Sequence, residues 1–339
     1  MDHLLNLEKY QQVYSYEIAR RLPALLPEHE WFFHDDDRAK WPGTVVGQFD
    51  DVAADLVLNF SGNPQHAGLP TVTFVFDAYA AARANWLEKI LARFRKPPVT
   101  DWSDVRAVLV PHRALRTELV EKHPALATRV RVVGAALPPE IAALSPADSV
   151  TRRITKEVYG REKSYFLAPA TDNLERLIAA YDLFRARCPE QVLLLLARPQ
   201  MGLPRAVRGA IKASPYRADI SVLPLLNDAE YWKVYSSARA ILYPALAATF
   251  PVEILKAWRA GVPVLATDND VLGGGGAQVR GENVKSVAEG MVALVTTPFL
   301  ASGMVANGSR RLASFTWEAA AERTADVLRS ELAFLTANT

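Results

Sequence analysis

The sequence has few of the residues that build disulfides and metal sites. Its 339 residues include one cysteine, Cys188, and six histidines. A single cysteine excludes an internal disulfide and a cysteine-based zinc site within the chain. The histidines are scattered and show neither an HExxH nor another paired spacing. We therefore expect no metal, and we interpret Cys188 as an ordinary small residue near a helix end.

Long apolar runs and a large net charge are also missing. No uninterrupted apolar run approaches the roughly 20 residues that a membrane-spanning helix needs. The first residues, MDHLLNLEKY, lack the basic stretch followed by an apolar one that marks a signal peptide. Charged residues make up 22% of the chain and the formal net charge is +2, so we expect no nucleic-acid partner. A reducing, cytoplasmic setting fits these features.

Strand-like and helix-like segments alternate along most of the chain. The segments 54–60, 70–77 and 105–111 are apolar runs bounded by glycine or proline, which is typical of buried parallel strands. The alternation restarts after a looser stretch that contains three prolines, 137–153. Two such halves predict an α/β protein with two Rossmann-like parallel-sheet lobes. Ligands of such sheets bind beyond the carboxyl ends of the strands.

Helices are predicted over 13–26 and 252–260, and EWFFH (30–34) is predicted to be a strand.

The looser stretch divides the chain. We expect an N-terminal lobe over 1–140, a linker over 141–160, a C-terminal lobe over 161–318 and a C-terminal helix over 319–339.

The strongest local signal is YPALAATFPVEILKAWRAGVPVLAT, residues 243–267. It resembles the donor-site segment of family-four (group 1) retaining glycosyltransferases, where a strand ending in Tyr-Pro precedes an acidic loop with a Phe, a Glu-bearing helix and Gly-x-Pro-Val. The matching residues are Tyr243, Pro244, Phe250, Leu255, Ala257, Gly261, Pro263 and Val264. Segments such as TDNLERLIAAYDLF and SFTWEAAAERTADVL are similar to further family segments in the same order. The resemblance implies the GT-B architecture, with two Rossmann-like lobes facing across a cleft.

The sequence departs from this family where the donor nucleotide is expected. The family carries two glutamates eight positions apart, one near the sugar and one on the ribose, and this chain has Ala248 and Lys256 there. A lysine cannot accept a hydrogen bond from a ribose hydroxyl. Glu253 could substitute, but it could also pair with Lys256, because i and i+3 share a helix face. We favour the pairing.

A second departure concerns the donor diphosphate. The family places an Arg and a Lys near it, whereas here Asp172 takes the lysine's place before Asn173. An anion beside a phosphate reverses an interaction of about 4 kcal/mol at about 4 Å and a dielectric constant of about 20. Arg176 or Arg198 could supply the missing positive charge only if the backbone placed one of them differently from the family. Four glycines, 273–276, could hold a phosphate on backbone N–H groups or simply form a mobile loop.

The N-terminal half departs as well. Many relatives end the strand that PTVTFVFD resembles in His-Asp, and here the pair is Phe76-Asp77. Phenylalanine can neither donate a hydrogen bond nor transfer a proton. The family's glycine-rich first turn is replaced by LNLEKYQQVYSYEIARRL, which has no glycine and no convincing strand before Tyr10, although Glu8 and Glu17 keep the frame. The N-terminal lobe is therefore shortened at its start.

These losses favour a catalytically degenerate GT-B protein of cell-envelope or polysaccharide assembly. It would act as a binding subunit or partner of an active glycosyltransferase, or as a homo-oligomer. The alternative is an active retaining glycosyltransferase (a hexosyltransferase) with a rearranged site, a nucleotide-sugar donor, a glycan acceptor and no other cofactor. Its candidate catalytic residues are Asp77 and Glu253. Its candidate donor-binding residues are Asp172, Asn173, Thr249, Phe250, Glu253, Lys256, Gly273 and Gly274.

One basic, amphipathic segment bears on the membrane. RANWLEKILARFRK, residues 83–96, could rest on an anionic surface at the inner face of the membrane. The same pattern is typical of a surface helix that buries one face, which we favour. The sequence thus predicts at most peripheral membrane contact.

Overall fold

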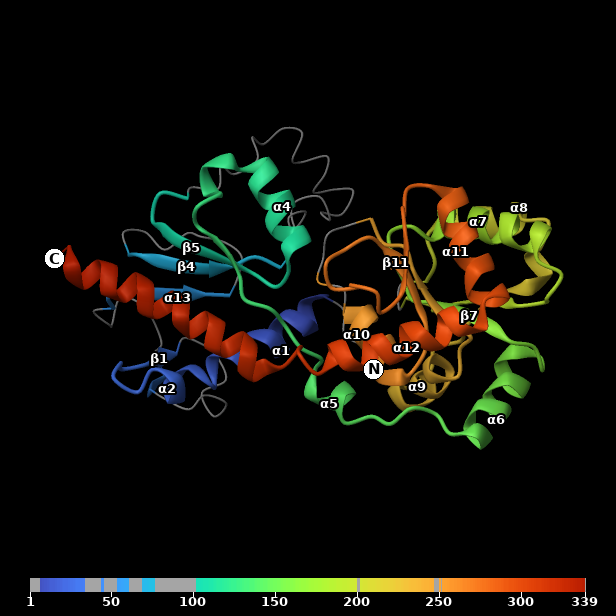
Figure 1. The fold of residues 1–339 in the computed structure, drawn as a ribbon, viewed down its shortest axis with the longest axis horizontal. Coiled ribbons are helices and arrows are strands. Elements are labelled where there is room, and N and C mark those ends of the chain that lie inside the picture. Colours follow the sequence, from blue (N-terminus) through green and yellow to red (C-terminus); the bar gives the residue numbers. More distant parts are fainter. Residues whose placement is uncertain are drawn as a thin grey trace. The chain divides into compact units, whose positions relative to one another are not determined.

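Two larger parallel β-sheets with their helices organise the chain (Figure 1). The computed structural model describes residues 7–33, 44–45, 54–60, 69–76, 102–199, 202–246, 250 and 252–338. The chain divides into an N-terminal unit (Glu8–Ala136, Ala248–Phe250 and Phe315–Thr339) and a C-terminal unit (Met1–Leu7, Leu137–Ala247 and Pro251–Ser314). The predicted α/β class with two parallel-sheet lobes is confirmed.

The N-terminal unit contains a four-stranded parallel sheet in the order β3-β4-β5-β6. Its strands are β3 (Val57–Asn59), β4 (Thr71–Phe74), β5 (Val105–Val110) and β6 (Val130–Val132). The helix α4 (Arg113–Lys122) and a short turn, η4 (Pro124–Leu126), connect β5 to β6. A separate parallel pair joins β1 (Phe32–Phe33) to β2 (Thr44–Val45). The strands predicted over 30–34, 54–60, 70–77 and 105–111 are therefore present, each shorter than expected.

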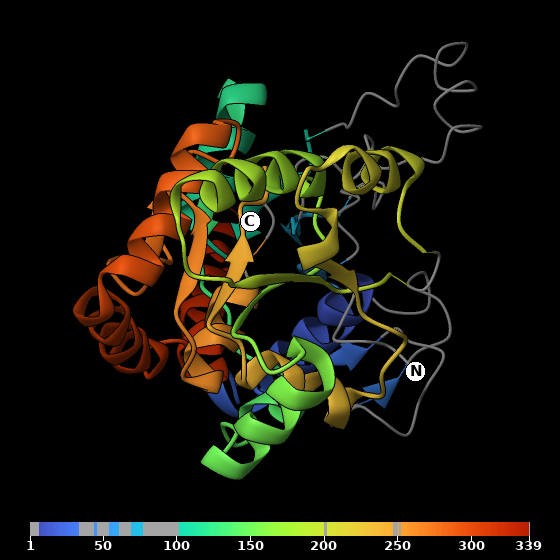
Figure 2. The same ribbon diagram turned by 90° about the vertical axis from the view of Figure 1, so that its right-hand side faces the viewer.

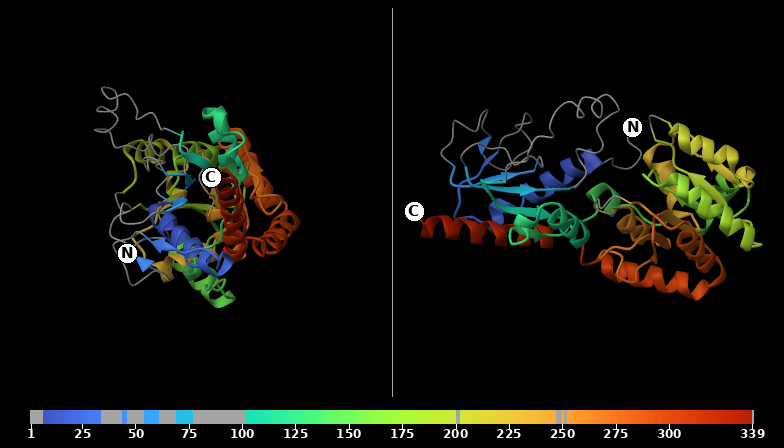
Figure 3. Two further views of the ribbon diagram at one scale, coloured as in Figure 1. Left: turned by 90° about the vertical axis from the view of Figure 1, so that its left-hand side faces the viewer. Right: turned by 90° about the horizontal axis from the view of Figure 1, so that it is seen from above.

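Helices from both ends of the chain complete this unit. The first are α1 (Leu7–Ala19) and α2 (Leu22–Leu25), and the last is α13 (Trp317–Ala337). The predicted helix over 13–26 thus begins earlier and is divided after Ala19. Figure 3 shows α13, in red, running beside the blue and teal strands of the sheet. Arg329 of α13 donates to the Leu25 carbonyl over 2.8 Å, which ties the last helix to α2.

The C-terminal unit contains a six-stranded parallel sheet in the order β12-β11-β10-β7-β8-β9. The strands are β7 (Tyr165–Ala168), β8 (Leu193–Leu196), β9 (Ile220–Val222), β10 (Ala240–Tyr243), β11 (Val264–Thr267) and β12 (Ala277–Val279). The order reverses between β7 and β10. In open sheets of this kind, ligands bind beyond the carboxyl ends of the strands at such a switch point.

Eight α-helices of this unit lie within the described residues. They are α5 (Pro139–Ala142), α6 (Ser149–Gly160), α7 (Leu174–Arg187), α8 (Arg205–Ala213), α9 (Asp228–Ser236), α10 (Val252–Ala260), α11 (Val284–Thr296) and α12 (Pro298–Leu312). One apolar core joins the sheet to α7 and α11, and Cys188, the C-cap of α7, is buried in it. The interpretation of Cys188 as a small residue at a helix end is confirmed.

The predicted helix over 252–260 matches α10 residue for residue. The stretch expected to be a linker contains α5 and α6. The short strand β12 and the helix α8 were not predicted, because β12 has only three residues, AQV, and α8 follows a proline- and glycine-rich run. The amphipathic segment 83–96 lies outside the described residues.

Among the described residues, none of the single helices is both long and apolar enough to cross a membrane. Val284–Thr296 and Phe299–Leu312 together have the length and composition of a membrane-spanning segment, but the pair is bent by 99°.

Candidate functional site

One buried side chain joins three loops at the carboxyl edge of the C-terminal sheet. Asn173 lies between β7 and α7 and is 2% exposed. Its Nδ2 donates to the Pro244 carbonyl over 2.7 Å and to the Gly281 carbonyl over 2.8 Å. These carbonyls follow β10 and β12. Asn173 therefore fixes the loops at the place where a ligand of such a sheet would bind.

The neighbouring residues hold the same loops. The backbone N–H of Leu246 donates to Asp172 Oδ1 over 3.1 Å, and Thr267 Oγ1 donates to the Ala245 carbonyl over 2.6 Å. Gly281 is packed so closely that a Cβ would lie 2.4 Å from Thr267 Oγ1. Asp172 thus holds the backbone after β10, at the position where the resemblance places a phosphate-binding lysine.

A guanidinium also reaches this edge. Arg176, on the first turn of α7, donates from NH1 to Asn173 Oδ1 over 3.3 Å and is otherwise exposed. A positively charged side chain is therefore present near Asp172 and Asn173, although it belongs to a different sequence position from the lysine of the family.

The side chains of α10 form an internal ion pair. Lys256 is completely buried, and its Nζ bonds to Glu253 Oε1. Tyr235 of α9 donates to Glu253 Oε2 over 3.0 Å, and Lys256 Nζ lies 5.8 Å from the Tyr235 ring centroid. Burial, with the nearby Glu253 carboxylate, raises the pKa of Tyr235 well above its usual value. The pairing favoured from the sequence is present.

The four glycines form a closely packed turn between β11 and β12. A Cβ on Gly273 (φ +38°) would lie 2.4 Å from the Arg311 guanidinium, and one on Gly275 would lie 2.6 Å from the Trp258 ring. Trp258 Nε1 donates to the Gly275 carbonyl over 2.7 Å. Close packing thus accounts for Gly273 and Gly275, whereas Gly274 is exposed and has open space around it.

Aromatic side chains fill the carboxyl edge of the N-terminal sheet. Phe76 follows β4 and is 2% exposed. Its ring lies 5.0 Å from that of Tyr14, edge to face, and 5.8 Å from that of Phe74. Tyr14 also contacts Trp317 of α13 at 5.3 Å. Phe76, which stands where the resemblance places a histidine, is therefore part of a buried aromatic cluster.

Two tyrosines of α1 extend this cluster. The Tyr14 hydroxyl donates to the Gly134 carbonyl over 2.6 Å, and the Tyr10 hydroxyl donates to the Ala136 carbonyl over 3.1 Å, both beyond β6. Phe250, which belongs to this unit, stacks on Tyr10 with centroids 5.4 Å apart. The contacts of these two tyrosines were not predicted from the sequence. The spacing of Tyr10 and Tyr14, four residues apart on a helix, was the available signal.

The buried tyrosines predict a loss of stability in alkali. Burial raises the pKa of Tyr10, Tyr14 and Tyr235 well above the value of about 10 expected in an unfolded chain. Above pH 10 the unfolded chain releases protons that the folded chain retains, so the free energy of unfolding is unaffected below pH 10 and falls above it. We expect the urea midpoint to fall steeply between about pH 10 and 11.5, and less steeply in a Tyr10→Phe, Tyr14→Phe variant. A midpoint that stays constant over this interval would contradict the burial.

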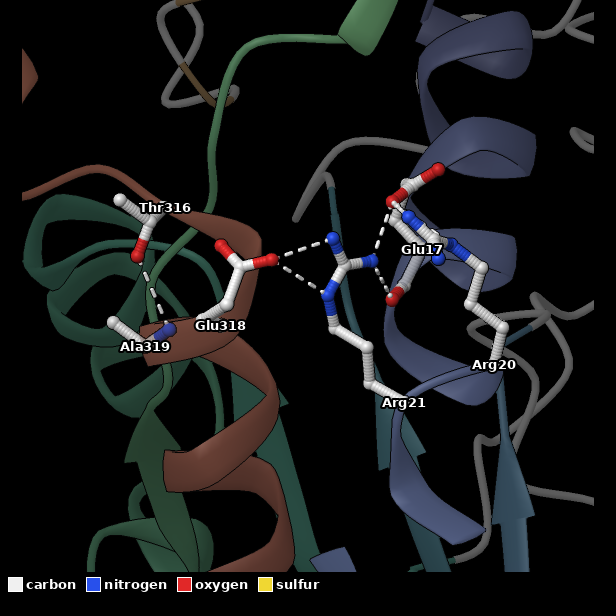
Figure 4. Close-up of polar contacts among 6 residues, drawn as sticks. All are labelled: Glu17, Arg20, Arg21, Thr316, Glu318 and Ala319. Carbon is white, nitrogen blue, oxygen red and sulfur yellow. Dashed lines mark hydrogen bonds and ion pairs between the residues drawn. The ribbon is translucent and has the colours of Figure 1, made fainter. Parts of the chain in front are cut away.

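Glu17, one of the two glutamates that still align with the family near the start of the chain, binds two arginines within the N-terminal unit (Figure 4). Glu17 is 5% exposed, and its Oε2 accepts from Arg20 over 2.6 Å and from Arg21 over 2.5 Å. Arg21 also donates from Nε and NH2 to Glu318 Oε1, over 3.0 and 2.7 Å. The hydrogen bond from Arg21 lowers the pKa of Glu318. Thr316 caps the helix that carries Glu318, so the cluster joins α1 to the start of α13.

The remaining candidates, Asp77 and Thr249, lie outside the described residues. In the described part of the chain, no group of three or more His, Cys, Asp or Glu side chains could hold a metal ion. Of the candidates that can be placed, Asp172 and Asn173 lie together at the loops after β7, Glu253 pairs with Lys256, and the two glycines lie in the turn before β12.

Comparisons with known proteins agree with this architecture. Residues 164–297 match the family model of group 1 glycosyl transferases. No curated protein shows a significant match to the sequence. Among solved structures, WaaG, a glycosyltransferase involved in lipopolysaccharide biosynthesis, is 17% identical, with 94% of this chain and 95% of that chain covered and a TM-score of 0.64.

Two further glycosyltransferase-like structures align over the same extent. A glycosyltransferase from Rickettsia africae is 12% identical, with 97% and 95% of the two chains covered and a TM-score of 0.66. Anabaena Alr3699/HepE, solved in complex with UDP and glucose, is 12% identical, with 94% and 96% covered and a TM-score of 0.65. The chain therefore has the GT-B fold of these glycosyltransferases, and its residues 164–297 are similar to the group 1 glycosyl transferases.

Proposed function

We propose that this protein is a catalytically degenerate GT-B glycosyltransferase homologue that acts as a binding or partner subunit in glycan assembly. The observation that carries the proposal is the position of Lys256. The resemblance puts a ribose-binding glutamate there, and this chain has a completely buried ammonium that bonds to Glu253. A buried carboxylate already bonded to an ammonium has less capacity left to accept hydrogen bonds from a ribose.

Two further substitutions support the proposal. Phe76 replaces a polar histidine with a ring that is packed between Tyr14 and Phe74. Asp172 replaces a cation with a carboxylate that accepts a backbone N–H. The Phe76 ring packs in the aromatic cluster and the Asp172 carboxylate holds a backbone N–H, so both side chains make structural contacts. Neither one provides a cation or a proton donor to a sugar phosphate.

The proposed setting is cell-envelope or polysaccharide assembly on the cytoplasmic side of the membrane. The structural similarity to WaaG, whose role is in lipopolysaccharide biosynthesis, supports this setting. The proposed partner is an active glycosyltransferase. Co-purification of the tagged chain from its host should recover such an enzyme, and a tagged chain that recovers only itself would count against a heterologous partner.

An active retaining hexosyltransferase is the second candidate. The match of residues 164–297 to the group 1 family model favours it, as does the cation Arg176 near Asp172. The structure of HepE with UDP and glucose suggests a uridine nucleotide sugar as donor. Glu253 and Asp77 would then carry the chemistry. The donor would contact Asp172, Asn173, Thr249, Phe250, Lys256, Gly273 and Gly274 in addition to Glu253.

Nucleotide release from sugar donors distinguishes the two candidates. The purified chain is incubated with UDP-, GDP-, ADP- and CMP-sugars, with and without a glycan extract of the host as acceptor. We expect no release above that of a Glu253→Gln variant. Release that the Glu253→Gln variant loses and an exposed-acid control, Glu282→Gln, retains would overturn the proposal and establish the enzyme.

A further inference from the structure

An apolar stripe lies on the solvent-facing side of α6. Val150, Ile154 and Val158 are 55%, 49% and 63% exposed. They are four residues apart, so they lie along one face of the helix. The other face buries Thr155 and Gly160. Figure 2 shows α6, in green, at the lower margin of the C-terminal unit.

A second apolar area is tied to the end of this helix. Arg161, which follows α6, donates to Ser221 Oγ over 2.8 Å. Ser221 belongs to β9, the edge strand of the six-stranded sheet. Val222 of the same strand and Leu225 after it are 41% and 52% exposed. Exposed edge strands and their apolar side chains are sites at which proteins associate.

The charges beside the stripe are of opposite sign. Arg153 and Glu157 lie one turn apart on the same side of α6, with 3.9 Å between Nε and Oε1, and their side chains are 72% and 53% exposed. In an antiparallel helix pair related by a twofold axis, the same surface patch faces itself and the sequence direction is reversed. Arg153 of one copy then faces Glu157 of the other copy, and the contact occurs twice.

We propose that α6 is an interface between two copies of this chain, packed antiparallel across Val150, Ile154 and Val158. The self-complementary pair of charges supports a second copy as the occupant. A membrane surface fits less well, because α6 has none of the Trp, Phe or Leu residues that membrane-binding helices place on their apolar face, and Glu157 beside the stripe would face anionic lipid.

Self-association and the contribution of the stripe are measured first. One helix face and a strand edge make a small interface, below about 1,200 Å², so we expect a dissociation constant in the micromolar range. Sedimentation velocity over a concentration series should show a monomer–dimer equilibrium. Ile154→Glu should raise the dissociation constant at least about ten-fold, because it buries a charge in the apolar contact. The matched control is Phe299→Glu, at a residue that is 89% exposed on α12, and it should leave the dissociation constant unchanged.

The antiparallel geometry has its own test. Arg153→Glu places two acids beside the stripe and Glu157→Arg places two bases, so each variant alone should dimerise more weakly than the wild type. An equimolar mixture of the two should form a heterodimer with approximately wild-type affinity, because opposite charges again face each other twice. A wild type that stays monomeric throughout the series, a dimer insensitive to Ile154→Glu, or a mixture that does not associate would each overturn the proposal.

Discussion

Replacing Lys256 with methionine is expected to lower the free energy of unfolding by about 3 kcal/mol, which is at the lower end of the range for breaking a buried ion pair. The variant keeps most of the side-chain volume but leaves the Glu253 carboxylate, 12% exposed, without its cation. Tyr235 continues to donate to Glu253, but a neutral hydroxyl does not replace the ammonium. Urea unfolding monitored by circular dichroism measures the effect.

A double-mutant cycle assigns this loss to the pair itself. Glu253→Gln alone should also destabilise, because it leaves a buried ammonium without a carboxylate. Glu253→Gln together with Lys256→Met should recover most of the loss, since replacing both charges of a buried pair is often nearly neutral. The control Lys285→Met, at an exposed lysine on α11, should change the free energy of unfolding by less than about 0.5 kcal/mol. An equally small effect of Lys256→Met would contradict a structural role for Lys256.

Replacing Tyr14 with alanine is expected to cost about 3–5 kcal/mol, in the range for truncating a large buried aromatic side chain. The ring contacts Phe74, Phe76 and Trp317 at centroid distances of 5.2, 5.0 and 5.3 Å. Truncation would therefore open a cavity at the carboxyl edge of the N-terminal sheet.

The variant Tyr14→Phe separates packing from hydrogen bonding. It keeps the ring and removes only the bond to the Gly134 carbonyl, so it should cost about 1 kcal/mol. Both variants are compared with the wild type by urea unfolding. If Tyr14→Ala were no more destabilising than Tyr14→Phe, the aromatic cluster would not fill this edge of the sheet.

The parallel sheets could be predicted from the sequence because buried strands are short apolar runs bounded by turn residues. The segments YFLA and VLLLLA show this pattern, and β7 and β8 lie within them. The helix α10 could be predicted residue by residue because Pro251 precedes it and Gly261 follows it. α6 was missed because three prolines precede it and favoured a linker there, although Val150, Ile154 and Val158 are spaced four residues apart, as on one face of a helix.

The candidate site was less accessible to sequence reasoning. The pairing of Glu253 with Lys256 could be predicted because both lie on one helix, three residues apart. The bonds of Asn173 to the carbonyls of Pro244 and Gly281 span 71 and 108 residues of chain. A local pattern carries no information on such contacts, because they depend on the order of strands in the folded sheet. The aromatic cluster of Tyr14 and Phe76 was missed for the same reason.

The most direct test of the central claim is the binding of nucleotides to the pure protein. A ligand that binds only the folded chain adds about 2.7 kcal/mol of stability at a hundred times its dissociation constant. We predict no saturable shift of the melting temperature with UDP, GDP, ADP, CMP or their sugar conjugates. The reason is that Lys256, Asp172 and Phe76 make structural contacts at the positions where the family binds its donor. A saturable shift with one of these nucleotides, absent with the others, would show that the donor site is intact and would contradict a degenerate role.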